Sequence, residues 1–393
     1  MTTCRLDFED LLSDRSLAID VSGIRRVFEL GAKLDNPINL SIGQPDFPVP
    51  QAIKDATIDA ILADRNGYTL TQGVPELRSA IVRRIRDDVG WDVPSDDLGL
   101  IVTSGTSGGL LLAMMATLNP GDEVIVPDPY FVVYPALVEL TGGRAVYCDT
   151  YPDFRLTAER VEPLITERTK LLLLNSPSNP SGVVLRTSEL RDIVELCESR
   201  GVLIVSDEIY DEFTYDDGRE DGRCPSPARL TDRLLLVRGF GKTYGCTGWR
   251  MGYAAGPKPV LDQMAKLQQY TFVCAPSMAQ FGLAVAFDVD MGPLVRSYQA
   301  KRDRVLAALA PVTNVTHPAG AFYAFVEVPA AVAGSATAFV ERATERNVLV
   351  IPGNVFSRRD THFRLSYAAP DETLDKGLAI LAEMLSGGDR EQL

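Results

Sequence analysis

Residues 169–210 give the clearest indication of the fold class, and they read TKLLLLNSPSNPSGVVLRTSELRDIVELCESRGVLIVSDEIY. Their two nearly continuous apolar runs predict strands at 169–175 and 202–208, and the amphipathic run between them predicts a helix at 187–201. Strands that are apolar on both faces and alternate with helices are typical of a parallel sheet with both faces covered. Ligands of such sheets bind beyond the carboxyl ends of the strands, so the polar residues found there are the first candidates for a functional site.

The same alternation of short apolar runs and longer amphipathic runs extends over residues 100–255. It predicts further strands at 98–104, 122–127, 144–148, 233–240 and 250–256, and further helices at 107–119 and 257–270. The last hundred residues instead predict a smaller α+β unit, with strands at 321–328, 347–352 and 362–369 and helices at 335–346 and 372–385. A helix from about residue 276 is expected to join the two parts, and the polar segment 216–232 is expected to be a surface loop.

These patterns predict an α/β protein. We expect a large domain, residues 45–290, in which a mostly parallel seven-stranded sheet is covered by helices. A smaller α+β domain is expected to form from residues 1–44 together with residues 291–393.

Composition limits the partners and the compartment. The formal net charge of −14 argues against nucleic acid or an anionic membrane as a partner. The six cysteines are scattered without a C-x-x-C pair, and the start MTTCRLDFED lacks the basic and apolar runs of a signal peptide, so a reduced, cytoplasmic protein is expected. With only two histidines, His317 and His362, a multi-histidine site is not expected, and we predict no metal.

Lys242 lies in LLLVRGFGKTYGCTGWRMGY, residues 234–253, which holds parts of two nucleotide-binding motifs. A P-loop requires a glycine five positions before Gly241, where this sequence has Leu236. The dinucleotide fingerprint requires a third glycine where Tyr244 stands. Because each interpretation fails by one structurally required glycine, the simplest alternative is an ordinary surface lysine.

Four predicted strand ends together argue against that alternative. The run Gly105-Thr106-Ser107 precedes a predicted helix, whose free N–H groups and dipole form an anion site. NSPSNPSG (175–182) and DEIY (207–210) follow two further strands, and Lys242 with Arg250 follows a fourth. Each piece alone is most often a cap or a turn, but the shared placement after strands is much more specific.

With these residues the sequence resembles the class I and II pyridoxal-phosphate-dependent aminotransferases, the fold-type-I family that includes aspartate aminotransferase. The resemblance covers nearly the whole chain. It is carried by INLSIGQPDFPVP (38–50), YTLTQGVPELRSAI (68–81), NSPSNPSG (175–182), SDEIYDEFTYDD (206–217), GFGKTYGCTGWRMGY (239–253), HPAGAFYAFVEV (317–328), VLVIPGNVF (348–356) and FRLSYA (363–368).

The resemblance implies an enzyme that moves an amino group from an L-amino acid to a 2-oxo acid through a Schiff base between Lys242 and pyridoxal 5′-phosphate. It gives Lys242 the further task of moving a proton between Cα and the cofactor's C4′. It places Asp207 beside the protonated pyridine nitrogen. The ion pair between them is expected to be the only interaction that offsets the free-energy cost of burying this carboxylate. Asn179 and Tyr210 are expected to donate to the phenolic oxygen. The implied catalytic residues are Lys242, Asp207 and Tyr210.

The resemblance also implies the binding residues. The cofactor is expected to contact Gly105, Thr106, Ser107, Phe131, Asn179, Asp207, Tyr210, Lys242, Arg250 and Tyr68. Among these, the helix start and Arg250 would hold the phosphate, and Phe131 would stack on the ring. Tyr68 would reach the phosphate in a neighbouring subunit, which implies a homodimer. The substrate is expected to contact Gly43, Asn179 and Arg364, with Arg364 gripping the α-carboxylate.

Three residues depart from the family's pattern. Gly241 replaces the usual serine and forgoes a contact to phosphate or backbone. Arg238 stands where a small polar residue is commoner, and it either adds positive charge near the site or points into solvent. Phe131 replaces Trp or Tyr and keeps the stacking.

Substrate choice is constrained by the phosphate loop, SGTSGG (104–109), which has no lysine of the kind that one aspartate-specific branch uses. We therefore expect a neutral or aromatic amino donor to suit the site at least as well as aspartate, with 2-oxoglutarate or pyruvate as the acceptor. Two other functions remain open. One is a different pyridoxal-phosphate reaction on this scaffold, such as C–S β-lyase chemistry or a biosynthetic elimination or cyclisation. The other is a catalytically silent ligand sensor, against which the presence of Lys242 argues.

Overall fold

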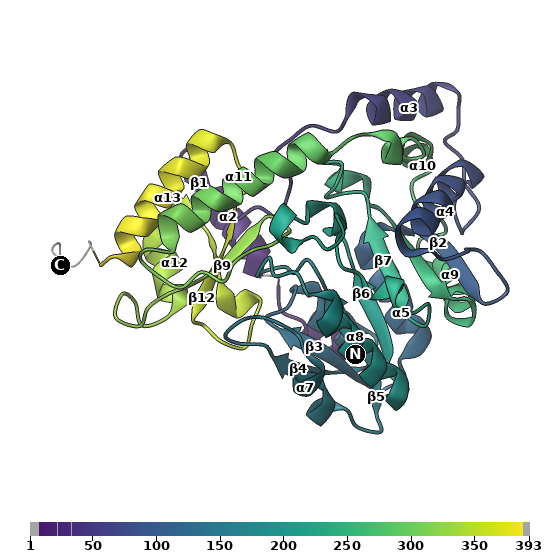
Figure 1. The fold of residues 1–393 in the computed structure, drawn as a ribbon, viewed down its shortest axis with the longest axis horizontal. Coiled ribbons are helices and arrows are strands. Elements are labelled where there is room, and N and C mark those ends of the chain that lie inside the picture. Colours follow the sequence, from purple (N-terminus) through teal and green to yellow (C-terminus); the bar gives the residue numbers. More distant parts are fainter. Residues whose placement is uncertain (1–7, 22, 33, 388–393) are drawn as a thin grey trace, which may run out of the picture.

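The computed structural model describes residues 8–21, 23–32 and 34–387. A seven-stranded sheet crosses the larger part of the molecule, and a smaller group of strands and helices lies beside it (Figure 1). The strand order is β2-β8-β7-β6-β5-β3-β4, and all strands are parallel except β8, which is antiparallel to both its neighbours. The bounds are β2 Leu98–Ser104, β3 Glu123–Asp128, β4 Arg144–Asp149, β5 Thr169–Asn175, β6 Leu203–Asp207, β7 Leu235–Gly239 and β8 Met251–Pro257. The predicted α/β class and mostly parallel sheet are confirmed.

Both faces of this sheet are covered, which explains the unbroken apolar runs in its strands. Leu171 and Leu173 of β5 pack in a core with α5, α6 and α9, whereas Leu172 and Leu174 pack on the opposite face with α4 and α8. The helices of this part are α3 Gln51–Leu62, α4 Pro75–Val89, α5 Gly105–Thr117, α6 Val133–Leu140, α7 Ala158–Val161, α8 Thr187–Arg200, α9 Lys258–Thr271 and α10 Ser277–Leu283.

The smaller part is built around a three-stranded antiparallel sheet, β11-β12-β9, and a parallel pair, β1-β10. Its strands are β1 Ile38–Asn39, β9 Tyr323–Glu327, β10 Val348–Leu349, β11 Ile351–Pro352 and β12 His362–Ser366. The remaining helices are α1 Asp14–Leu17, α2 Gly23–Gly31, α11 Gly292–Leu309, α12 Ala336–Glu345 and α13 Asp371–Leu385. Helix α11 runs from the smaller part toward the larger one (Figure 1).

Two expectations need correction. The joining helix expected from about residue 276 is two helices, α10 and α11, separated by a 3₁₀ turn at Ala286–Asp288. Pro293 in the first turn of α11 explains the restart, because proline lacks the N–H that a continuing helix would use. The segment 216–232 is not simply a surface loop, since its Pro225, Ser226, Pro227 and Ala228 are buried.

The division into residues 45–290 and residues 1–44 with 291–393 stays a prediction. The core of the smaller part also contains Tyr210, Phe213 and Tyr215, which follow the strand that carries Asp207. The two parts therefore share a packed boundary next to the carboxyl ends of the large sheet.

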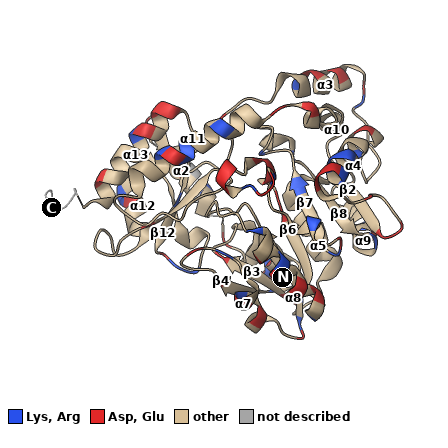
Figure 2. Cartoon of the chain, viewed as in Figure 1, with Lys and Arg blue, Asp and Glu red and all other residues tan. Residues whose placement is uncertain are grey.

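Charged side chains of both signs are spread over the outer helices (Figure 2). Among the described residues, no single helix is long and apolar enough to cross a membrane; only the bent pair Ser277–Asp288 and Gly292–Leu309 passes, by length and composition, at an angle of 81°.

Candidate active site

A cavity of about 310 Å³ lies where the predicted strand ends meet. It is lined by Ile24, Ile42, Gly43, Gln44, Gly105, Thr106, Ser107, Phe131, Tyr134, Asn175, Asn179, Asp207, Ile209, Tyr210, Gly241, Lys242, Thr247, Arg250, Met251, Tyr323 and Arg364. These include every residue singled out from the sequence as a site residue except Tyr68, whose side chain is 88% exposed. The geometry brings the other residues together, while their roles stay predictions.

Lys242 occupies the turn after β7 and reaches across the cavity. Its Nζ donates a hydrogen bond to the backbone carbonyl of Gly43, from a segment some two hundred positions earlier in the chain. The pKa of Lys242 is lowered to about 8, mainly by burial and also by the cations Arg364 and Arg250, against the opposing effect of Asp207. Roughly a fifth of this amine is therefore neutral near pH 7.4, and the neutral form is the one that acts as a nucleophile or a base.

This shifted pKa gives the first testable result. We expect reductive methylation of Lys242 by formaldehyde, in the protein without ligand, to reach half its maximal rate near pH 8, because only the neutral amine reacts. The measurement is mass spectrometry of the Lys242 peptide after short exposures between pH 6 and pH 11. A half-maximum at or above about pH 10, the value of an ordinary lysine, would contradict the burial argument.

Asp207 ends β6 and is 3% exposed. Its carboxylate accepts a hydrogen bond from the Tyr134 hydroxyl at 2.9 Å and one from the Ile209 backbone N–H at 3.3 Å. Burial raises the pKa of Asp207 to about 6, because desolvation outweighs these two donors. The expectation that only an ion pair with a ligand offsets the burial of this carboxylate is therefore wrong, since Tyr134 and the turn after β6 also stabilise it.

Two asparagines connect Asp207 to the far side of the cavity. The Asn175 side chain donates to the Asp207 backbone carbonyl and accepts from the Asn179 backbone N–H, both at 2.9 Å. The side-chain oxygen of Asn179 accepts from Arg364 at 3.1 Å. Because Arg364 already donates to that oxygen, the part of the Asn179 side chain that can bind a ligand as a donor is its amide N–H₂.

Arg364 is 1% exposed and is held on all sides. Its guanidinium carbon lies 4.5 Å from the ring centres of both Tyr323 and Phe356, and its Nη2 donates to the Ser41 carbonyl at 2.8 Å. Its Nε is buried without a hydrogen-bond partner among the described residues. Arg364 also lines the cavity, and a carboxylate is the ligand group that matches a guanidinium best.

The opposite end of the cavity is suited to a second anion. Helix α5 begins at Gly105, whose φ of +70° suits glycine, and the side chain of Ser104 does not cap its first N–H groups. A Cβ added to Gly105 would lie 2.8 Å from Arg250 Nη2, so Arg250 rests directly against this helix start. A close contact also favours glycine at position 241, because a Cβ there would lie 3.3 Å from the Cα of Thr247.

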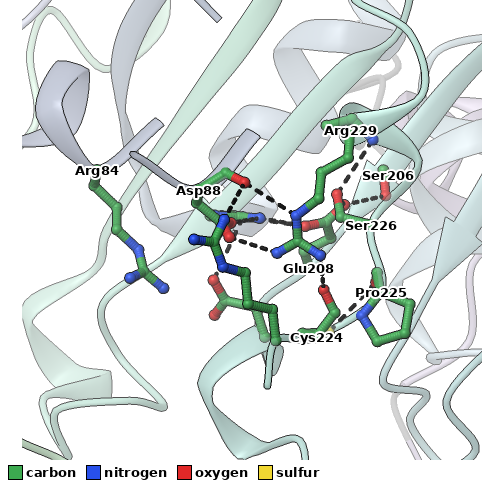
Figure 3. A network of polar contacts seen from close by, with 12 residues as sticks. Arg84, Asp88, Ser206, Glu208, Cys224, Pro225, Ser226 and Arg229 are labelled. Carbon is green, nitrogen blue, oxygen red and sulfur yellow. Dashed lines mark hydrogen bonds and ion pairs between the residues drawn. The ribbon is translucent and has the colours of Figure 1, made fainter. Parts of the chain in front are cut away.

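Arg238 does not line the cavity, and the alternative that it points into solvent is wrong. It is 2% exposed and forms ion pairs with Asp88 at 2.7 Å, with Glu208 at 2.8 Å and with Asp211 at 3.4 Å. We call these four residues the Arg238 cluster. Figure 3 shows Asp88 and Glu208 among the surrounding polar side chains, where Arg229 also pairs with Asp88 at 2.5 Å. The cluster ties α4 to the ends of β6 and β7; β6 ends at Asp207, and β7 ends shortly before Lys242.

Sequence reasoning missed Tyr134 and Tyr323 as cavity residues. Both come from aromatic-rich stretches in which a core position and a cavity position look alike. For Asn175 the sequence left two alternatives, a part in the cofactor network or a strand end, and its side chain connects Asp207 with Asn179.

Known proteins resemble this chain over almost its full length. The family model described as aminotransferase class I and II matches residues 35–381. The chain is 36% identical over 384 residues to the probable aspartate aminotransferase of Methanocaldococcus jannaschii, which covers 95% of this chain and 100% of that protein. It is 31% identical over 383 residues to aromatic-amino-acid aminotransferase 2 of Thermococcus litoralis, with coverage of 95% and 98%. The solved structure of aspartate aminotransferase from Thermus thermophilus with maleate aligns with a TM-score of 0.88 at 34% identity, covering 95% of this chain and 99% of that chain.

Proposed function

This chain belongs to the class I and II aminotransferases, and on that premise we propose how its own residues move an amino group from an L-amino acid to a 2-oxo acid with pyridoxal 5′-phosphate as cofactor. The observation that carries the proposal is one cavity that combines the Lys242 amine, the buried Asp207 carboxylate and two separate anion-binding ends.

The residues present fit this cofactor. The start of α5 and Arg250 would hold its phosphate, because uncapped N–H groups and a guanidinium both favour a dianion. Asp207 would pair with its ring nitrogen, and Phe131 would lie against its ring. When bound, pyridoxal phosphate supplies an aldehyde that takes up the amino group and a ring that withdraws electrons from the substrate Cα.

The remaining chemistry belongs to the chain. Lys242 would hold the aldehyde between turnovers, and its neutral amine would then take the proton from the substrate Cα. Burial raises the pKa of Asp207 to about 6, so its carboxylate would attract a proton held on the ring nitrogen more strongly than an exposed aspartate would. Tyr134 would keep the Asp207 carboxylate oriented through its hydrogen bond of 2.9 Å.

Arg364 would bind the α-carboxylate of both donor and acceptor. Its position between two rings and its bond to Asn179 leave it one orientation, so a bound carboxylate also fixes the direction of the Cα–H bond. Among the described lining residues, the cations other than Lys242 are Arg250 and Arg364, and both already have a task. This supports a neutral or aromatic donor at least as well as aspartate.

A donor and acceptor screen tests the function. Purified protein is incubated with pyridoxal phosphate, a panel of L-amino acids and either 2-oxoglutarate or pyruvate, and keto acid, new amino acid and ammonia are all quantified. We expect keto acid and new amino acid in equal amounts, only with an acceptor, and with neutral or aromatic donors at least as fast as aspartate. Ammonia released without an acceptor would instead indicate the lyase or elimination alternative.

We also propose a homodimer in the cytoplasm. Tyr68 is 88% exposed, and the exposed apolar residues Leu62, Leu70 and Tyr270 support a surface covered by a second copy. Sedimentation of the purified protein at the mass of one chain, 42.9 kDa, would refute the dimer. The scattered cysteines support the cytoplasmic location, which cell fractionation tests.

A further inference from the structure

Two tyrosine hydroxyls meet at one side of the cavity. Tyr210 Oη and Tyr323 Oη are 3.0 Å apart, and both side chains are buried, at 3% and 1% exposure. Only one proton can lie between the two oxygens. The direction of this hydrogen bond therefore decides whether the Tyr210 hydroxyl donates to Tyr323 or can donate to a group in the cavity.

Arg364 favours Tyr323 as the donor. Its guanidinium carbon lies 4.5 Å from the centre of the Tyr323 ring, and a cation over a phenol ring makes the hydroxyl more acidic. The Tyr210 ring instead packs edge-on against Phe322 and Tyr323. Burial raises the pKa of both hydroxyls and Arg364 lowers the pKa of both, whereas their mutual hydrogen bond raises the pKa of Tyr210 and lowers that of Tyr323. In a pair of hydroxyls the more acidic one donates, so the proton between them comes from Tyr323.

Gly43 makes this arrangement possible. A Cβ added to Gly43 would lie 2.7 Å from Tyr323 Oη, so any larger residue would push the hydroxyl away from its place. The carbonyl of the same glycine accepts from Lys242. The Tyr323 hydroxyl is thus fixed between the backbone segment that contacts Lys242 and the oxygen of Tyr210.

We propose that Tyr323 is a positioning residue, whose hydroxyl donates to Tyr210 and so keeps the Tyr210 proton directed into the cavity. This inference rests on the proposed function, in which Tyr210 donates that proton to the phenolic oxygen of pyridoxal phosphate. The same side chain covers one face of Arg364. Tyr323 therefore orients two groups: the Tyr210 hydroxyl, which would donate to the cofactor, and the Arg364 guanidinium, which would bind the substrate.

The variant Tyr323→Phe separates these two effects, because it removes the hydroxyl and keeps the ring over Arg364. The readout is the pH midpoint of the absorbance change of the protein loaded with pyridoxal phosphate. A weaker donor from Tyr210 leaves more proton affinity at the phenolic oxygen, so the midpoint is expected to rise by about half a pH unit. We expect kcat to fall roughly two- to tenfold, while KM for the donor changes less than about twofold.

Two further variants make the test specific. Tyr210→Phe should shift the midpoint at least as far as Tyr323→Phe, and the double variant should shift it no further than Tyr210→Phe, because Tyr323 acts through Tyr210. The matched control is Tyr367→Phe, which removes an equally buried hydroxyl that pairs with Tyr215 at 3.1 Å outside the cavity lining. Its midpoint should equal that of the unaltered protein, and its loss in unfolding midpoint should match that of Tyr323→Phe.

The outcomes distinguish the inference from the function on which it rests. An unaltered protein that takes up no pyridoxal phosphate would overturn both. A loaded protein whose midpoint is unmoved by Tyr323→Phe, or moved equally by Tyr367→Phe, would overturn the role of Tyr323 alone. Additive shifts in the double variant would also overturn it, because they would mean that Tyr323 acts independently of Tyr210.

Discussion

Replacing Lys242 with alanine is expected to lower the rate of amino-group transfer by at least about a thousandfold. The variant loses both the amine that would hold the aldehyde and the base that would move the Cα proton. Among the described residues that line the cavity, the other cations are Arg250 and Arg364, and a guanidinium has N–H donors but no acceptor. Neither arginine can therefore take over either role.

The measurement compares steady-state transfer with the best donor and acceptor from the screen, together with mass analysis of borohydride-treated protein. Lys242→Ala should show no cofactor attached at position 242. The matched control is Lys258→Ala, since Lys258 is half-exposed and pairs with Asp262 one helical turn away, at 2.6 Å. That variant should retain the full rate. A Lys242→Ala protein that keeps more than about a tenth of the rate would refute the role of this amine.

Replacing Arg238 with methionine is expected to lower the free energy of unfolding by about 3–5 kcal/mol. The change leaves Glu208, which is 1% exposed, without its cation, and takes one of two arginines from Asp88. Burial would raise the pKa of Asp88, but Arg238 and Arg229 together lower it below its ordinary value, which shows how strongly this carboxylate depends on them. Most of the lost stability comes from the burial of a carboxylate that no longer has a counter-ion.

A second substitution tests this cause. The double variant Arg238→Met with Glu208→Gln should recover part of the loss, because it removes the unpaired charge. The amide can still accept from Ser206 and Ser226, whose hydroxyls bond Glu208 at 2.9 Å and 2.7 Å. Equilibrium urea unfolding followed by circular dichroism compares the unaltered protein with the single and double variants. A double variant less stable than Arg238→Met would contradict the argument and indicate that packing dominates the loss.

An exposed ion pair serves as the control. Arg86 pairs with Asp92 at 2.8 Å, and the two side chains are 58% and 80% exposed. Arg86→Met should change the free energy of unfolding by less than about 1 kcal/mol, because water already screens this pair. The contrast between two arginine-to-methionine changes isolates the effect of burial.

The large sheet could be predicted because its strands bury both faces and so read as continuous apolar runs. The seven predicted strands agree with β2 to β8 within two residues at each end. The cavity residues could be predicted as a group for a related reason. Parallel strands bring their carboxyl ends to one edge, so the residues after β5, β6 and β7 had to lie close together.

Contacts made across the chain could not be predicted in the same way. Tyr134 reaches Asp207 from 73 positions away, and Tyr323 reaches Tyr210 from 113 positions away. Nothing in the local pattern distinguishes such a tyrosine from one that only fills a core. Arg238 shows the same limit, because its partner Asp88 lies on α4, 150 positions before it, and a strand arginine with no visible partner looks exposed.

The contacts of Arg364 also set an order of events during synthesis. Its guanidinium contacts Asn179 and the Ser41 carbonyl, which lie 185 and 323 positions before it in the chain. The last strand of the large sheet ends at Pro257, so a ribosome completes these strands, together with Asp207 and Lys242, well before Arg364 emerges. A nascent chain of intermediate length therefore contains the residues proposed for the cofactor but not Arg364, the residue proposed to bind the substrate α-carboxylate.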